Sequence, residues 1–213
     1  MNKIFTIKPA RENKKLSMFI KKTKAEFENF FKFTVKEPPI FLLNSRHDMD
    51  IVWGKKTKEW FAGAVKNRNI YIFNPGIFSQ VSSHKKDDFW QILKHEYCHV
   101  FFLQIANTNR PLWLNEGLAF HLSGKKITFD RIEKEKFLGV FKYFDTVDKE
   151  AYAIGQFWVE KLIKKFGKTK LIELINELFP DISENDFAKK FQKIYKIKYN
   201  SRSFEKMAKN FLN

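Results

Sequence analysis

The first part of the chain combines helical and extended patterns of apolar residues. Residues 12–31 carry apolar side chains at roughly helical spacing, which predicts a helix. The short apolar run 40–43 follows two prolines and predicts a strand, whereas the polar stretch 44–50 predicts a loop.

Two further apolar runs predict a β-hairpin. Residues 60–65 and 70–73 flank the polar segment 66–69, which contains two asparagines. Apolar runs around a short Asn-containing turn are typical of hairpin strands. Asn74-Pro75-Gly76 ends the second of them.

From residue 87 the pattern is helical to the end of the chain. Residues 87–105 are apolar on almost every side, which indicates a buried helix, and two aspartates suit its start. A break at Arg110-Pro111 precedes a second short helix at 112–122. Further helices are predicted at residues 130–140, 149–166, 169–178, 183–195 and 201–212.

These elements predict an α+β fold in a single domain. A small N-terminal β-containing lobe, approximately residues 1–106, would hold the first helix, the sheet and the buried helix. A mainly helical C-terminal lobe would cover residues 107–213. With 213 residues and 44% hydrophobic composition, the chain is long and apolar enough for a substantial core.

Composition narrows the class of protein. The only cysteine, Cys98, excludes an internal disulfide, and no apolar stretch suits a signal peptide or a membrane span. We therefore expect a cytoplasmic protein with no membrane partner. The net charge of +16 favours a lysine-rich solvated surface. Nucleic-acid binding is the weaker interpretation, because no RNA-recognition, helix-turn-helix or zinc-finger signature accompanies the charge.

The buried helix contains the sequence His95-Glu96-Tyr97-Cys98-His99. On a helix, His95 and His99 lie on one face about 6 Å apart in rise, so both imidazoles can reach one Zn²⁺. Glu96 lies beside them, where a base that activates water is needed. The alternative is a pair of hydrogen-bonded core histidines, and Cys98 fits a small buried apolar residue better than a nucleophile or ligand.

Glu116 is the candidate third ligand. It follows His99 after sixteen intervening residues, in an otherwise apolar helix, and an antiparallel return of the chain would bring it toward the two imidazoles. Gly117 beside it would permit close packing between helices. The alternative for Glu116 is an exposed carboxylate near a helix start.

The His-Glu-x-x-His motif, followed by Trp113-Leu114-Asn115-Glu116-Gly117-Leu118-Ala119, resembles the gluzincin clan of zinc metallopeptidases. That clan includes thermolysin and the alanyl aminopeptidases. The likeness covers roughly residues 60–179 and implies a zincin-like (thermolysin-like) catalytic domain. It also implies that His95, His99 and Glu116 bind one zinc ion and that Glu96 is the general base.

The resemblance extends to two further regions. Ala62, Gly63 and Ala64 would belong to an edge strand that pairs with an extended substrate, although an ordinary hairpin strand fits equally well. Tyr152 is the candidate oxyanion donor, with Tyr143 and His121 as alternatives, and a core tyrosine is an equally good interpretation.

Two positions depart from the clan. Thermolysin-type enzymes carry an aspartate that supports a zinc histidine, one turn after the glutamate ligand, and here that position is Phe120. Alanyl aminopeptidases carry an acid in their edge-strand motif that binds the substrate amine, and residues 61–65 contain none. Exopeptidase specificity is therefore not supported.

The sequence thus predicts a zinc metallopeptidase, an endopeptidase-type hydrolase that cleaves a peptide or protein substrate. Two alternatives remain. The first is a zinc-scaffolded protein-binding module, either non-catalytic or latent because its own tail blocks the cleft. The second is a basic nucleic-acid-binding protein. The sequence gives no indication of oligomeric state.

Overall fold

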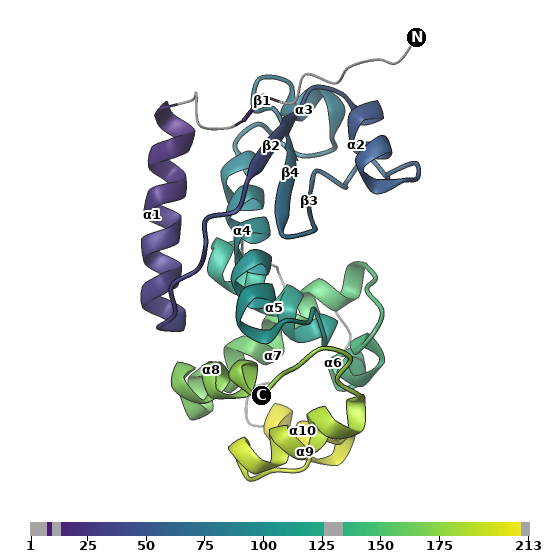
Figure 1. Ribbon diagram of the computed structural model, residues 1–213. Helices are drawn as coiled ribbons and strands as arrows, with labels where there is room; N and C mark the ends of the chain where they lie inside the picture. Colours follow the sequence, from purple (N-terminus) through teal and green to yellow (C-terminus); the bar gives the residue numbers. More distant parts are fainter. Residues whose placement is uncertain (1–7, 10–13, 126–133, 210–213) are drawn as a thin grey trace. The chain divides into compact units, whose positions relative to one another are not determined.

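The computed structural model describes residues 8–9, 14–125 and 134–209. The chain divides into two compact units, Met1–Phe101 and Phe102–Asn213. The division falls within helix α4 (Asp88–Ala106), which therefore contributes residues to both units. Helices dominate and one small sheet is present, so the predicted α+β class is confirmed (Figure 1).

The first unit contains a four-stranded sheet in the order β1-β2-β4-β3. Its strands are β1 (Lys8–Pro9), β2 (Ile40–Leu43), β3 (Gly63–Lys66) and β4 (Asn69–Phe73). Strands β2 and β4 pair in parallel, whereas the β1–β2 and β3–β4 pairs are antiparallel. Among the strands that the structure describes, β3 therefore lies at an edge of the sheet.

The predicted hairpin is confirmed as β3 and β4. Its two turn residues, Asn67 and Arg68, have positive φ angles of 51° and 61°. Two successive left-handed residues form a type I′ turn, whose twist matches that of the flanking strands. Lys66 and Asn69 pair across this turn, which fixes the register of the hairpin.

Helix α1 (Lys14–Phe31) confirms the described part of the first predicted helix, and residues 12–13 lie outside the described residues. Its buried face carries Phe27 and Phe31. Both rings contact Phe101 of α4, with centroids 5.5 and 5.4 Å away, and Phe27 also contacts Tyr97. This aromatic packing holds α1 against the part of α4 around Tyr97 and Phe101.

The predicted loop at residues 44–50 was wrong, because a helix begins there. Helix α2 (Arg46–Trp53) starts at Ser45, whose side chain accepts a hydrogen bond from the Asp48 amide, and ends at the left-handed Gly54. Met49 is its one buried residue, so no apolar period revealed it. The four-residue helix α3 (Phe78–Val81) was likewise not predicted.

The second unit is helical. After α4 come α5 (Leu112–Ser123), α6 (Lys134–Leu138), the 3₁₀ helix η3 (Gly139–Tyr143) and α7 (Lys149–Phe166). Three helices complete it, namely α8 (Lys168–Asn176), α9 (Glu184–Tyr195) and α10 (Ser201–Lys209). Each helix predicted after residue 105 is present, although α8 ends at Asn176 rather than residue 178 and Ser183 caps α9 instead of belonging to it. Residues 130–133 and 210–212 of those predictions lie outside the described residues.

Helices α5 and α7 meet at two glycines. A Cβ atom on Gly117 would lie 2.2 Å from the carbonyl oxygen of Gly155, and one on Gly155 would lie 2.3 Å from the carbonyl oxygen of Trp113. Both distances are far below van der Waals contact, so only glycine fits at either position. Close helix packing at Gly117 is therefore present, and its partner is α7 rather than the helix that carries the two histidines.

The C-terminal helices pack on α5 through Trp113. The indole N–H of Trp113 donates to the hydroxyl of Tyr199 at 3.0 Å, and the Trp113 ring contacts Phe187 of α9. Burial raises the pKa of Tyr199 above its usual range.

Within the described residues, no helix has the length and apolar character needed to cross a membrane.

Candidate metal centre

Helix α4 carries two histidines whose rings converge. His95 and His99 lie one helical turn apart, and their Nε2 atoms are 3.0 Å from each other. The ring centroids are 4.6 Å apart and the ring planes are almost perpendicular. Both imidazoles therefore present the same nitrogen to one point in space.

Glu116 of α5 completes a cluster with the two histidines. One ligand atom from each of the three residues lies within 4.8 Å of the others. The three side chains are partly buried. The predicted approach of Glu116 to His95 and His99 is therefore present in the structure.

The cluster fits a metal ion in both chemistry and spacing. Two imidazole nitrogens and one carboxylate oxygen form a His₂Glu donor set, which leaves a position open on a four-coordinate ion. Bonds of about 2.0–2.1 Å in tetrahedral geometry place two nitrogens about 3.3 Å apart. The observed Nε2–Nε2 distance of 3.0 Å is close to that value. His95, His99 and Glu116 could thus hold a metal ion.

Glu96 lies on α4 next to the first histidine and is only 7% exposed. It packs against the start of β3. A Cβ atom on Gly63 would lie 2.9 Å from Glu96 Cγ and 3.2 Å from Glu96 Oε1. Because Gly63 has no side chain, the side chain of Glu96 can pack directly against β3 at this position.

The register of the hairpin decides which main-chain groups of β3 face its free edge. Ala64 pairs with Tyr71, and Ala62 accepts a hydrogen bond from the Phe73 amide, so the main-chain groups of both alanines face β4. Alternation then directs those of Gly63 and Val65 toward the edge. Of the three predicted substrate-binding residues, Gly63 alone presents its main chain there. Val65 was missed, because only the pairing register reveals it.

The side chains of Ala62 and Ala64 have another role in the structure. Both are buried in the first unit. They stand on the face of the hairpin opposite to Gly63, because successive side chains of a strand alternate. Their small size contributes to core packing beside β4.

The three candidate oxyanion donors occupy different environments within the second unit. The Tyr143 hydroxyl donates to Asp148, the residue that caps the start of α7. His121 Nδ1 lies 3.5 Å from a carboxylate oxygen of Glu160. The Tyr152 ring packs against Phe120, with centroids 5.2 Å apart. Tyr143 is thus engaged in capping a helix, and Tyr152 lies beside the residue one turn after Glu116.

Phe120 and Cys98 both behave as apolar residues. Phe120 lies one turn after Glu116, and its ring packs on Tyr152. The Lys125 ammonium group lies 5.6 Å from the same ring. Cys98 is fully buried, as predicted for a small apolar residue.

Arg46 organises the loop that leads into β3 and was not singled out by the sequence. Its guanidinium donates to the carbonyl oxygens of Lys58, Glu59 and Phe61, at 2.9, 3.0 and 2.6 Å. It also donates to the Thr57 hydroxyl and the Val81 carbonyl. Burial lowers the pKa of Arg46. No motif surrounds this arginine, and its role appears only when the carbonyls converge.

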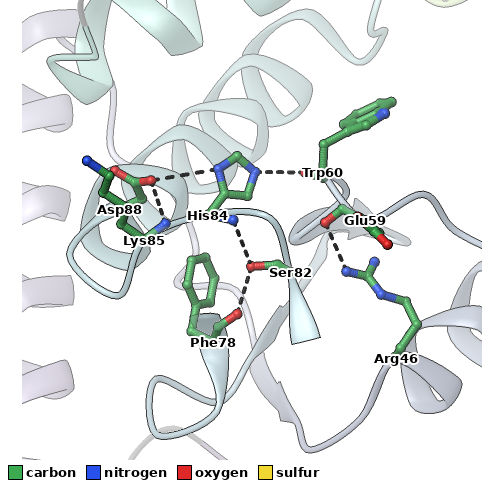
Figure 2. A network of polar contacts seen from close by, with 8 residues as sticks. All are labelled: Arg46, Glu59, Trp60, Phe78, Ser82, His84, Lys85 and Asp88. Carbon is green, nitrogen blue, oxygen red and sulfur yellow. Dashed lines mark hydrogen bonds and ion pairs between the residues drawn. The ribbon is translucent and has the colours of Figure 1, made fainter. Parts of the chain in front are cut away.

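His84 adds a second anchor to the same loop. Its Nε2 lies 2.8 Å from the Trp60 carbonyl oxygen and must donate to it, because a carbonyl only accepts. The other ring nitrogen lies 3.8 Å from the Asp88 carboxylate in the first turn of α4. Figure 2 shows His84 between Trp60 and Asp88, and Arg46 directed at Glu59.

Comparisons with protein-family models, with curated proteins and with solved structures found no match to this chain.

Proposed function

We propose that this protein is a zinc-dependent peptidase. The single observation that carries the proposal is the convergence of His95, His99 and Glu116, whose ligand atoms lie within 4.8 Å of one another. Two imidazoles and one carboxylate are the donor set of catalytic zinc sites such as that of thermolysin. The sequences of α4 and α5 resemble those of the gluzincin clan. This resemblance supports the same assignment, and it also supports a zincin-like domain.

Glu96 is the general base in this proposal. It is nearly buried, it is adjacent in sequence to one histidine, and its Oε1 lies 3.2 Å from the position that a Cβ atom on Gly63 would take. A zinc ion held by the cluster would supply the Lewis acid that polarises a carbonyl and acidifies water. Glu96 takes a proton from the attacking water and then delivers it to the nitrogen of the leaving amine.

The edge of β3 supports a peptide as substrate. Gly63 and Val65 direct their N–H and C=O groups away from β4, and an extended chain could pair with them as an added strand. Because Gly63 also contacts Glu96, a peptide bound along this edge would pass close to the base. Tyr152 is the proposed donor to the oxyanion that develops on the substrate.

The test of this proposal is the substitution Glu96→Gln. The amide is nearly the same size, so zinc affinity should be unchanged in a competition titration with a chromophoric chelator. Hydrolysis of a peptide library, followed by mass spectrometry, should fall by about 10²–10⁴-fold, the usual contribution of a general base. Glu173→Gln, at an exposed position of α8, is the matched control and should keep full activity.

A zinc-scaffolded module without catalysis is the second candidate. Phe120 favours it, because an apolar ring stands where thermolysin-type enzymes carry the aspartate that supports a zinc histidine. If this candidate is correct, zinc should raise the melting temperature, and the wild-type protein should cleave none of the peptides. Cleavage that is abolished by Glu96→Gln would exclude it.

A further inference from the structure

Trp60 is a large apolar residue that remains exposed beside the edge strand. Its side chain is 39% exposed, and its described ring contact is with Phe61, at 6.1 Å between centroids. Figure 2 shows the indole directed away from the polar network formed by Arg46 and His84. Tryptophan is enriched at binding surfaces. An exposed tryptophan on an ordered loop is therefore a candidate contact for a ligand.

The backbone around Trp60 is held at consecutive carbonyls. Arg46 binds the carbonyls of Lys58, Glu59 and Phe61, and His84 binds that of Trp60 itself. The Arg46 guanidinium also lies 4.7 Å from the Phe73 ring of β4, which ties the loop to the sheet. Four successive carbonyls therefore have fixed partners.

This arrangement holds the backbone at Trp60 in place before any ligand arrives. A side chain on a pre-ordered loop contributes more to binding, because little conformational entropy remains to be lost. Trp60 also precedes Gly63 by three residues, so it lies within about 10 Å of the point where β3 contacts Glu96. A peptide of a few residues would span that distance.

We propose that Trp60 is a specificity-determining residue that contacts an aromatic or large aliphatic side chain of the peptide bound along β3. This inference rests on the proposed peptidase function and names its substrate class. The preferred side chain lies about three residues from the scissile bond. Arg46 is a positioning residue, because it holds the loop that presents the indole.

The test compares two peptides that differ only at the position three residues from the cleaved bond, one with Phe and one with Ser. In the wild type the ratio of kcat/KM, Phe over Ser, is expected to be about tenfold. Trp60→Ala should bring this ratio close to one. Arg46→Lys should also reduce it and should increase amide hydrogen exchange at residues 57–61, because a lysine cannot donate to all these carbonyls.

Phe33→Ala is the matched control, because Phe33 is 43% exposed on the segment after α1. It should leave the Phe/Ser ratio unchanged. A wild-type ratio near one, or a ratio that Trp60→Ala leaves intact, would overturn the assignment of Trp60.

Binding of the same peptides to the Glu96→Gln protein, measured by fluorescence anisotropy, separates this inference from the peptidase proposal. If no peptide is cut but the Phe peptide binds more tightly through Trp60, the peptidase proposal fails and the contact stands. If Trp60→Ala changes neither cleavage nor binding preference, the contact fails whatever the catalytic outcome.

Discussion

The substitution Gly63→Ala tests the contact between the edge strand and the proposed base. The added methyl carbon would lie 2.9 Å from Glu96 Cγ and 3.2 Å from Oε1. Carbon atoms in van der Waals contact lie about 3.5–4.0 Å apart, so the two groups must separate by about 0.6–1 Å. Glu96 is almost completely buried and Cγ is near its backbone, so the carboxylate itself has to move.

A displacement of about 1 Å at a reacting group costs roughly 10²-fold in rate. We therefore expect kcat for a quenched fluorescent peptide to fall about a hundredfold in Gly63→Ala. Zinc affinity, measured by chelator competition, should change little, because Glu96 is not one of the three proposed ligands. The midpoint of urea unfolding should shift only modestly, since alanine suits a strand better than glycine.

Gly76→Ala provides the matched control for this experiment. Its closest neighbour is the Asn74 side chain at 3.5 Å, an ordinary contact distance, and its φ angle is not in the left-handed region. Gly76→Ala should retain wild-type turnover. Equal turnover in Gly63→Ala and Gly76→Ala would refute the idea that β3 sets the position of Glu96.

Three further predictions concern the helices, the metal and pH. In Gly155→Ala, the new Cβ atom would lie 2.3 Å from the Trp113 carbonyl oxygen and push α5 away. The free energy of unfolding, measured in urea, should fall by about 1–3 kcal/mol, and zinc binding should weaken. Zinc at about 100 times its Kd should add about 2.7 kcal/mol of stability in thermal unfolding, and Glu116→Ala should abolish this gain. Hydrogen bonds from Thr57 lower the pKa of Asp50 in the folded protein. The Asp50 carboxylate therefore stabilises the folded state fully above its unfolded pKa of about 3.9. This stabilisation is lost as the pH falls through the lower pKa of the folded state. The difference in melting temperature between wild type and Asp50→Asn should be present at pH 7 and shrink on acidification.

The sequence was most informative where apolar periodicity and spacing coincide. The helix around His95 and His99 could be predicted because it is apolar on nearly all sides, and Glu116 because it is polar within an apolar helix. Both predictions depend only on the order of apolar and polar residues along the chain. The cluster in the structure agrees with them, whereas zinc and catalysis remain proposals.

Features that lack an apolar period or that depend on tertiary contacts were not predicted. Helix α2 has one buried residue, so its existence rests on the Ser45 cap rather than on a pattern. The role of Arg46 arises from carbonyls that other segments bring to it. Val65 reaches the free edge only because the turn at Asn67 and Arg68 sets the pairing register. For Arg46 and Val65 the decisive information is which segments meet, and a local pattern does not contain it.

The hydrogen bond between Trp113 and Tyr199 has a practical consequence for how short a stably folded fragment can be. A chain cut after Lys196 would lose Tyr199 and leave the buried Trp113 indole N–H without this acceptor. An unmet buried donor costs about 1–3 kcal/mol, and the lost contacts of Phe204 with Trp158 and Phe191 add to it. Trp113 lies one turn before Glu116, so trimming the end of the chain would loosen the helix that carries Glu116. A fragment that keeps the His95, His99 and Glu116 cluster intact should therefore extend through α10, far beyond the cluster itself.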